Sequence, residues 1–202
     1  QQKGELPLVF FALFEVAYTC SPKPANFPSP ELWCLDTAQA EYEQDIENIR
    51  EQIAAGDVYQ INHTLRLKGV VNMPWVHFQH IGLRAPYGAY IETEEFIVAS
   101  GSPELFFHLD DRQIISRPMK GTARRGESVI ADKAQRSWLA DSKKNQAENL
   151  MITDMVRNDM GRVARPGSVG VSDLFSLEQY PTLWQMTSSV TAQTDSSVTE
   201  IF

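Results

Sequence analysis

The sequence predicts a single domain of the α+β class, in which helices pack on antiparallel sheets. Two hairpin patterns favour antiparallel strands, because in each of them two short apolar runs flank an acidic turn. Helical patterns, with apolar residues three and four positions apart, lie before and after these hairpins. With 202 residues, 43% of them hydrophobic, the chain can bury a sizeable core. Strands grouped apart from helices are typical of α+β proteins.

The first strand and the first helix are predicted before residue 57. Residues 8–19 are rich in Val, Phe, Ala and Tyr and predict a buried strand, which a loop with four prolines follows. A helix is expected to start at Asp36 or Thr37, where Gln39 is placed for a capping box with Asp36, and to end at Gly56. Its apolar residues recur at helical spacing.

A strand, a short helix and the first hairpin are expected next. Residues 58–67 alternate between apolar and polar side chains, which predicts a strand whose polar face meets solvent or lines a wet pocket. Residues 73–83 predict a short helix with Pro74 in its first turn. Residues 89–91 and 96–99 flank an acidic turn and predict a hairpin.

A second hairpin and two longer helices complete the predicted elements. Residues 105–109 are expected to pair with residues 113–116 across a short polar turn. Helices are expected over residues 130–139 and 145–160, and Gly161 is expected to end the second of them.

The charge and the cysteine content of the chain exclude some functions. The formal net charge of -8 and the isoelectric point near 5.0 oppose non-specific binding to nucleic acid or to an anionic membrane. The longest apolar run, residues 6–14, is too short to span a bilayer and lacks the basic flank of a secretion signal. Cys20 and Cys34 are a sparse pair, which is typical of reduced thiols. We therefore expect a cytoplasmic protein.

Glu148 lies within an apolar arc of the second long helix. At about 100° per residue it falls between Met151, Ile152 and Met155. A carboxylate on a core-facing stripe is costly unless it is paired or bound to a cation. Two interpretations follow: a buried salt bridge or cap near the helix start, or a ligand for a hard cation such as magnesium. The opposite side of the helix is expected to carry Asn149, Thr153 and Arg157.

A basic segment around Lys120 contrasts with the acidic chain. It covers residues 117–126 and contains two glycines and four cationic side chains. One interpretation is a solvated loop. The other is an anion-recognising turn, in which glycines allow close backbone approach. In such a turn, neighbouring positive charge and partial burial favour the neutral, nucleophilic form of the Lys120 amine.

Glu104 presents a carboxylate after the rigid turn Ser102-Pro103, just before the second hairpin. Taken alone it indicates little. The four histidines show no metal-ligand spacing, so a zinc site is not expected. The sequence also has no pattern of a Ser-His-Asp triad, a phosphate-binding loop or a dinucleotide fingerprint.

Together these segments resemble the chorismate-binding enzymes, a family that includes anthranilate, aminodeoxychorismate, isochorismate and salicylate synthases. The matching segments follow the family order and cover most of the chain. They are Gly56-Asp57-Val58-Tyr59-Gln60-Ile61-Asn62, Ser102-Pro103-Glu104, Arg117-Pro118-Met119-Lys120-Gly121-Thr122 with Arg125-Gly126, and Ala147-Glu148-Asn149-Leu150-Met151-Ile152 with Asp154, Arg157-Asn158-Asp159 and Gly161-Arg162-Val163. The resemblance implies the family's α+β fold, with two antiparallel sheets sandwiched and flanked by helices. Residues 1–202 are expected to form one such domain, truncated before its C-terminal part.

The residue before the Gly-Thr pair separates the branches of the family. Anthranilate synthases have a small residue there, whereas Lys120 is similar to the lysine of the aminodeoxychorismate synthases. The resemblance implies that the Lys120 amine adds to C2 of the chorismate ring as the C4 hydroxyl departs, and that ammonia then attacks C4 and expels the lysine. Glu104 is expected to protonate the leaving hydroxyl. The product is 4-amino-4-deoxychorismate, a precursor of 4-aminobenzoate and folate.

The resemblance implies roles for other residues and for a partner. Glu148 is expected to hold magnesium, which neutralises the ring carboxylate of the substrate. Gln60, Gly121 and Thr122 are similar to positions that line the substrate pocket. Gln185 stands where many members have histidine, so either an amide replaces the imidazole or that step is run differently. A glutamine amidotransferase subunit or domain is expected to supply the ammonia.

Two rival functions remain open at the level of sequence. The first is another reaction of the family, anthranilate or isochorismate synthesis, against which Lys120 argues. The second is a non-catalytic fragment, because the chain stops before the family's C-terminal acidic residues that complete the magnesium site.

Overall fold

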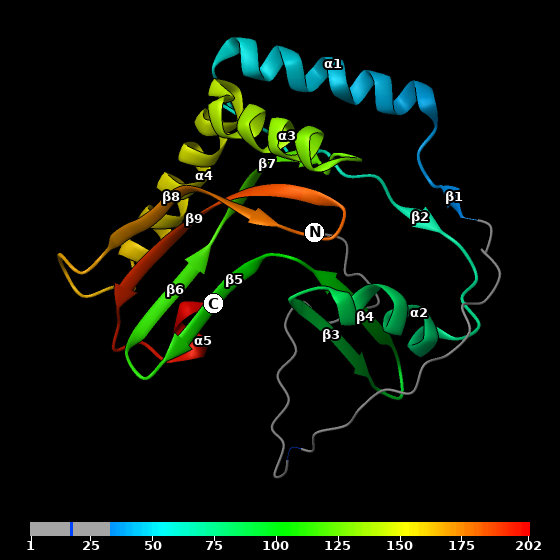
Figure 1. Cartoon of the computed structure of the whole chain (residues 1–202). Coiled ribbons are helices and arrows are strands. Elements are labelled where there is room, and N and C mark those ends of the chain that lie inside the picture. Colours follow the sequence, from blue (N-terminus) through cyan, green and yellow to red (C-terminus); the bar gives the residue numbers. More distant parts are fainter. Residues whose placement is uncertain (1–16, 18–32) are drawn as a thin grey trace. The chain divides into compact units, whose positions relative to one another are not determined.

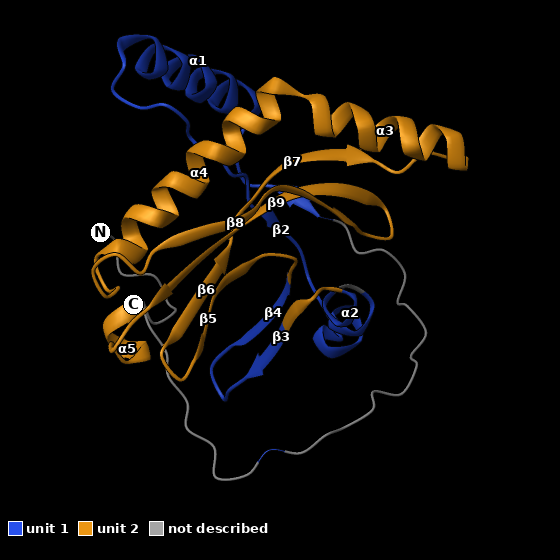
Figure 2. Ribbon diagram, turned by 60° about the vertical axis from the view of Figure 1, so that its left-hand side comes forward, with its two compact units in different colours: residues 1–84, 89–101 blue, residues 85–88, 102–202 orange. Residues whose placement is uncertain are grey.

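The computed structural model describes Ala17 and residues 33–202, which belong to two compact units (Figure 1, Figure 2). The first unit comprises residues 1–84 and 89–101, and the second comprises residues 85–88 and 102–202. Apart from Ala17, the strand predicted over residues 8–19 and the proline-rich loop after it lie outside the described residues. Among the described helices, none combines the length and the apolar character that a bilayer crossing requires.

Helix α1 (Gln39–Ala55) confirms the first predicted helix. It ends at Gly56, whose φ of 83° is the left-handed conformation that glycine readily adopts at helix ends. The predicted capping box is wrong, because the helix begins after Ala38 without a side-chain cap. The carboxylate of Asp36 instead binds the Lys68 ammonium at 2.9 Å. That hydrogen bond lowers the pKa of Asp36 and leaves its side chain unavailable to the helix N-terminus.

Only a short ladder forms where the alternating strand was expected. β1 (Cys34–Leu35) pairs antiparallel with β2 (Leu67–Lys68), and residues 58–66 have no strand structure. The strand prediction over residues 58–67 is therefore wrong except at its last residue. Alternation concerns the side chains, but a strand also needs a partner backbone, and in the described part of the chain only β1 supplies one.

The next two elements agree with their predictions. Helix α2 (Pro74–Ile81) has Pro74 in its first turn, where the missing N–H of proline costs no hydrogen bond, and continues into the 3₁₀ helix η1 (Gly82–Arg84). β3 (Tyr87–Glu92) and β4 (Ile97–Ser102) form the first hairpin. The Thr93 hydroxyl accepts the N–H of Phe96 at 3.1 Å and thereby closes the acidic turn.

A five-stranded antiparallel sheet with β9 at its centre forms the main part of the second unit. β6 and β7 lie end to end along one side of β9, and β8 runs along the other side. β5 pairs with β6 as the predicted second hairpin. The bounds of the strands are β5 (Leu105–Asp110), β6 (Gln113–Arg117), β7 (Met119–Arg124), β8 (Gly170–Gln179) and β9 (Leu183–Gln193).

Helices α3 (Val129–Asp141) and α4 (Lys143–Gly161) pack on this sheet and confirm the two long helices of the prediction (Figure 1). The hydroxyl of Ser128 caps the N-terminus of α3, and that of Ser142 caps the N-terminus of α4. Gly161 lies within the last turn of α4 rather than after it. A short helix, α5 (Val198–Ile201), follows β9.

The core of the second unit lies between the sheet and these two helices. Trp184 and Met186 of β9 pack with Ala123 and Leu139 in one buried cluster. Val190 and Ala192 of β9 pack with Ile114 and Met160 in another. The even-numbered residues of β9 therefore face α3 and α4. Because strand side chains alternate, its odd-numbered residues face the opposite side of the sheet.

The segment 117–126 is neither a solvated loop nor an anion-recognising turn. Most of it is β7, which pairs with β9, and Ala123 anchors it in the core. Two of its four cations are held in ion pairs, Arg117 with Glu178 and Arg125 with Asp132. Basic residues and glycines are uncommon in strands, so their number in this segment did not predict β7. No element was predicted for the segments that form β8 and β9.

Candidate active site

Lys120 lies in a β-bulge of β7. Met119 is paired with Thr187, and Thr122 is paired with Gln185. Between these pairs β7 contains two residues, Lys120 and Gly121, whereas β9 contains only Met186. The extra residue interrupts the regular alternation of β7, and bulges of this kind change the direction of a side chain beside functional sites. Lys120 is half-buried at this irregular point.

The carboxylate of Glu104 lies next to the bulge. Its Oε1 atom accepts the backbone N–H of Met119 at 2.9 Å. The turn before β5 is held by Ser102, whose hydroxyl accepts the N–H of Glu104 at 3.3 Å and donates to its carbonyl oxygen at 3.1 Å. Glu104 is exposed to solvent. The structure thus brings two of the predicted catalytic positions, 104 and 120, to the same end of β7.

Thr122 and Gln185 contact each other directly. They are partners in the β7–β9 ladder, and the Thr122 hydroxyl donates to Oε1 of Gln185 at 2.8 Å. The neighbours of Gln185, Trp184 and Met186, are buried against α3, so the Gln185 amide lies on the face of the sheet away from the helices. Two predicted substrate-binding residues therefore form one polar pair beside the bulge.

Gly121 has a conformation that other residues rarely adopt. Its φ is 99°, and a Cβ atom added to it would lie 3.0 Å from Cβ of Asn145 in the first turns of α4. A helix of the same unit therefore lies close to the backbone at this glycine. Gly121 allows the bulge and α4 to pack together.

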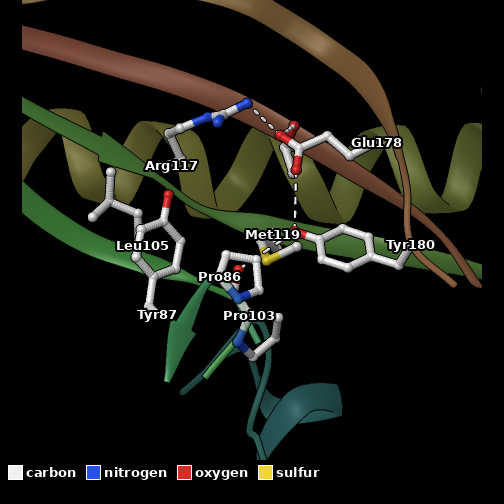
Figure 3. Close-up of a pocket in the computed structure, with 9 residues that line it drawn as sticks. Pro86, Tyr87, Pro103, Leu105, Arg117, Met119, Glu178 and Tyr180 are labelled. Carbon is white, nitrogen blue, oxygen red and sulfur yellow. Dashed lines mark hydrogen bonds and ion pairs between the residues drawn. The ribbon is translucent and has the colours of Figure 1, made fainter. Parts of the chain in front are cut away.

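A cavity of about 90 Å³ lies on the same unit beside Met119 (Figure 3). Arg117 and Tyr180 converge on the carboxylate of Glu178, and the Tyr180 hydroxyl donates to its Oε2 atom at 3.1 Å. The Thr187 hydroxyl donates to Oε1 of Glu178 at 3.0 Å. Burial, and then the nearby negative charge of Glu178, raise the pKa of Tyr180 to about 12.

This cavity is smaller than the several hundred Å³ that enclose a drug-sized ligand. It can hold part of a ring-sized molecule, and it borders the bulge through Met119. Sequence reasoning missed Glu178 and Tyr180. The available signal was the spacing of Glu178 and Tyr180, because side chains two residues apart in an extended segment point to the same face. No strand had been predicted there, so this spacing was not used.

Glu148 occupies a different position on α4 from the one expected. The buried face of this helix carries Asn149, Thr153 and Met160, whereas Glu148 is partly exposed and lies 3.8 Å from Nζ of Lys144. The core-facing assignment is therefore wrong. The reason is that α4 packs on polar groups of the sheet at this point, so polar side chains are buried. Of the expected apolar arc, Met155 is exposed and Met151 and Ile152 are only half-buried.

A complete metal site is not formed within the described residues. No three His, Cys, Asp or Glu side chains of that part of the chain gather where they could hold an ion. Glu148 offers one carboxylate, with an ammonium group as its charged neighbour. The described residues thus provide a single candidate ligand for magnesium.

Gln60 belongs to the first unit, whereas the other predicted site residues belong to the second. It is exposed, lies outside any strand, and its amide donates to Oδ1 of Asn62 at 3.2 Å. The prediction that Gln60 stands on the polar face of a strand is wrong, because residues 58–66 have no partner strand in the described part of the chain.

A partly buried ion pair fixes the start of α3 beside the end of β7. Two nitrogens of Arg125 donate to the two carboxylate oxygens of Asp132 at 2.7 and 2.6 Å. The Trp184 indole N–H and the backbone N–H of Gly126 also donate to Asp132, at 3.0 and 2.9 Å. The hydrogen bond from Arg125 is the main cause that holds the pKa of Asp132 far below its usual range. This network stabilises the framework of the site rather than reacting in it.

The α+β fold and the site residues on β7 and β9 agree with the result of a comparison with known protein families. Residues 11–202 match the family described as chorismate binding enzyme, which is nearly the whole chain. The chain therefore belongs to this family, as its motifs predicted. The family prediction is confirmed.

The similar curated proteins name two activities. The chain is 39% identical to aminodeoxychorismate synthase component 1 of Klebsiella aerogenes over 176 residues, which are 86% of this chain and 39% of that protein. It is 32% identical to the chloroplastic anthranilate synthase alpha subunit 1 of Oryza sativa subsp. indica over 159 residues, which are 77% of this chain and 28% of that protein. The chain thus spans about two fifths of the length of the first of these relatives.

A solved structure supports the fold. Anthranilate synthase component I from Streptococcus pneumoniae superposes with a TM-score of 0.74 at 23% sequence identity, over 86% of this chain and 38% of that one. The predicted α+β, anthranilate synthase component I-like fold is confirmed.

Proposed function

We propose that the protein containing this chain is an aminodeoxychorismate synthase component I, which converts chorismate and ammonia to 4-amino-4-deoxychorismate. The geometric observation that carries the proposal is the hydrogen bond from the Met119 N–H to the Glu104 carboxylate. This bond joins a candidate acid to the residue preceding the candidate nucleophile, Lys120. The 39% identity to an aminodeoxychorismate synthase component 1 supports the same activity.

The proposed first step is a covalent substitution. The neutral Lys120 amine attacks C2 of the chorismate ring, the ring double bonds shift, and the C4–oxygen bond breaks. The C4 hydroxyl takes a proton from Glu104 and leaves as water, and the amine gives one proton to solvent water as its new bond forms. In this step Glu104 is proposed to act as the general acid.

The proposed second step releases the product. Ammonia attacks C4, the ring electrons shift back, and the C2–nitrogen bond to Lys120 breaks with return of a proton to the amine. The sum is chorismate plus ammonia to 4-amino-4-deoxychorismate plus water. A covalent path divides one difficult displacement into two easier ones.

The remaining predicted residues are proposed to hold the substrate. Thr122, Gln185 and the backbone at Gly121 offer hydrogen-bonding groups beside Lys120. In this proposal the Gln185 amide takes the place of an imidazole. Gln60 is proposed to contribute a further amide.

Magnesium is proposed as the cofactor, with Glu148 as one of its ligands. When bound, the ion would neutralise a carboxylate of the substrate. Such an ion takes its ligands as carboxylate oxygens and waters, which suits a partly exposed glutamate. Further ligands are proposed to come from outside the described residues.

The ammonia is proposed to come from a glutamine amidotransferase subunit or domain. The designation "component 1" of the similar proteins implies a second component. We further propose that the protein works in the cytoplasm and in the route to 4-aminobenzoate and folate.

Mass spectrometry tests the covalent step. The complete protein is incubated with chorismate and magnesium without ammonia, and its peptides are analysed. We expect the mass of chorismate less one water on the peptide that contains Lys120, and loss of that adduct on addition of ammonium chloride. An unmodified Lys120 after incubation with chorismate and magnesium in the absence of ammonia would refute the nucleophile role.

Anthranilate synthesis is the second candidate function, because the rice anthranilate synthase subunit is 32% identical to this chain. The two reactions differ in product, so chromatography separates them. Formation of anthranilate from chorismate and ammonium chloride would favour the second candidate. A third possibility, a non-catalytic fragment, predicts that this chain alone binds neither magnesium nor chorismate in calorimetry.

A further inference from the structure

The β-bulge that carries Lys120 interrupts the regular ladder between β7 and β9. Lys120 and Gly121 together stand opposite the single residue Met186, so the backbone departs from regular strand geometry here. A carbonyl at the interface between a sheet and a helix is stabilised by a hydrogen bond. A donor group on the facing helix can therefore hold the bulge in one conformation.

Asn149 of α4 supplies that group. Its side-chain NH₂ donates to the carbonyl oxygen of Lys120 at 3.2 Å and to that of Met186 at 3.1 Å. One amide thus joins the bulged residue to the residue opposite it. Asn149 has no exposed surface. Water therefore does not compete for these bonds.

The other end of the Asn149 amide is also fixed. Its Oδ1 atom accepts the hydroxyl of Ser188 at 2.5 Å, and Ser188 continues the ladder because its N–H donates to the carbonyl of Pro118 at 3.2 Å. With both ends bonded, the amide has one orientation. A carboxylate of the same shape could keep the bond from Ser188 but could not donate to either carbonyl.

We infer that Asn149 is a positioning residue, whose buried amide clamps the bulge and so sets the direction of Lys120 toward its substrate. This inference rests on the proposed function of Lys120 as the nucleophile. Asn149 acts through the backbone and need not touch the substrate. Small displacements of a reacting group reduce rates strongly, so a clamp of this kind affects turnover more than affinity.

The test compares Asn149→Asp and Asn149→Ala with Thr153→Ala in the complete protein. Thr153 is the matched control, because it is buried one turn further along α4 and its hydroxyl donates at 2.7 Å to the carbonyl of Asn149 in its own helix. Its hydroxyl also lies 3.5 Å from Oδ1 of Asn149, but Thr153→Ala leaves in place both bonds from the Asn149 NH₂ group and the bond from Ser188. Thermal melting identifies a temperature at which each variant is folded. If Asn149→Ala does not fold, Asn149→Asp, which keeps the shape of the side chain, carries the test.

Two readouts separate positioning from stability. The first is the rate at which acetic anhydride labels Lys120, measured by mass spectrometry relative to the exposed Lys133 in the same sample. The second is turnover of chorismate with ammonium chloride. We expect Asn149→Asp to change the relative labelling of Lys120 and to lower kcat by about 10- to 100-fold while KM changes by less than about threefold. Thr153→Ala should change neither.

Failure of the inference is distinct from failure of the proposed function. If the Asn149 variants match Thr153→Ala in both labelling and kcat, Asn149 does not position Lys120, and the inference is overturned. If the wild-type protein forms no Lys120 adduct with chorismate, the proposed function is refuted. In that case the labelling readout remains valid by itself: a changed relative labelling of Lys120 in Asn149→Asp would still show that Asn149 holds the bulge.

Discussion

Glu104 and Met119 are joined by a hydrogen bond of 2.9 Å from the backbone N–H of β7 to the carboxylate Oε1 atom. One bond thereby fixes an acidic side chain from the start of β5 beside the residue that precedes Lys120. The two residues are 15 positions apart in the sequence, and the β5–β6 hairpin brings them together. The proposed chemistry therefore depends on the turn formed by Ser102, Pro103 and Glu104, which places the carboxylate beside β7.

Glu104→Gln tests the acid separately from the hydrogen bond. The glutamine carbonyl oxygen can still accept the Met119 N–H, but it cannot deliver a proton to the leaving hydroxyl. We expect kcat to fall by about 10²- to 10⁴-fold, with a nearly unchanged melting temperature. Steady-state kinetics measure the effect, and Glu94→Gln, an exposed glutamate in the first hairpin, is the control. Full activity in Glu104→Gln would assign the proton to another group.

Lys120→Ala should leave folding nearly intact and abolish most of the amination. The bond between the bulge and Asn149 uses the carbonyl of Lys120 and not its side chain, so the backbone is expected to hold its shape. We expect kcat to fall by about a thousandfold or more. Some activity could persist if ammonia attacks the ring directly. Lys133→Ala, in an exposed position of α3, should behave like the wild type, and equal rates for both variants would contradict the nucleophile role.

Gly121→Ala should destabilise the second unit. A side chain at a φ of 99° costs about 1–2 kcal/mol, and the new Cβ would lie 3.0 Å from Cβ of Asn145. Crowding of this kind adds about 1–3 kcal/mol. Gly167→Ala is a matched control, because its φ is 77° but no atom lies within 4 Å of an added Cβ. Urea unfolding measures both free energies, and equal losses would show that contact with α4 is unimportant.

Asp132 should make stability depend on pH in the acid range. Its pKa is lowered in the folded state, chiefly by the hydrogen bond from Arg125, so its contribution is present above the unfolded value near 3.8 and is lost as pH falls toward the folded value. The difference in the free energy of unfolding between wild type and Asp132→Asn should therefore be large at pH 7 and shrink below about pH 4. Asp154→Asn, which alters an exposed ion pair with Arg157, is the control and should have little effect. A difference that stays constant from pH 7 to pH 3 would contradict this assignment.

Local patterns predicted the helices and hairpins because these depend on neighbouring residues. The spacing of apolar residues and Gly56 placed α1, and the acidic turns placed the two hairpins. The strand over residues 58–67 could not be judged in the same way, since its formation depends on a distant partner. For β7, the charges and glycines of the segment concealed a strand that is defined by its ladder with β9.

The candidate site shows the same division. Motif resemblance selected Glu104, Thr122 and Gln185, and the structure brings all three to β7 and its neighbouring backbone. The motif resemblance could not show that Asn149 rather than Glu148 faces the sheet. A helical wheel assumes that apolar residues point to the core, but here a polar side chain of α4 is buried because it donates to the carbonyls of Lys120 and Met186.

The central place of β9 has a consequence for the order in which the molecule can be assembled. This strand, residues 183–193, pairs with β6, β7 and β8, so two of its three partners are made more than fifty residues earlier in the chain. During synthesis, the edges of β6 and β7 that pair with β9 stay unpaired until β9 has left the ribosome. Pairings between such distant segments form slowly, and an unpaired edge is prone to associate with other chains. The protein should therefore be most vulnerable to aggregation in the interval between the synthesis of β7 and that of β9, when chaperone binding has its greatest effect on yield.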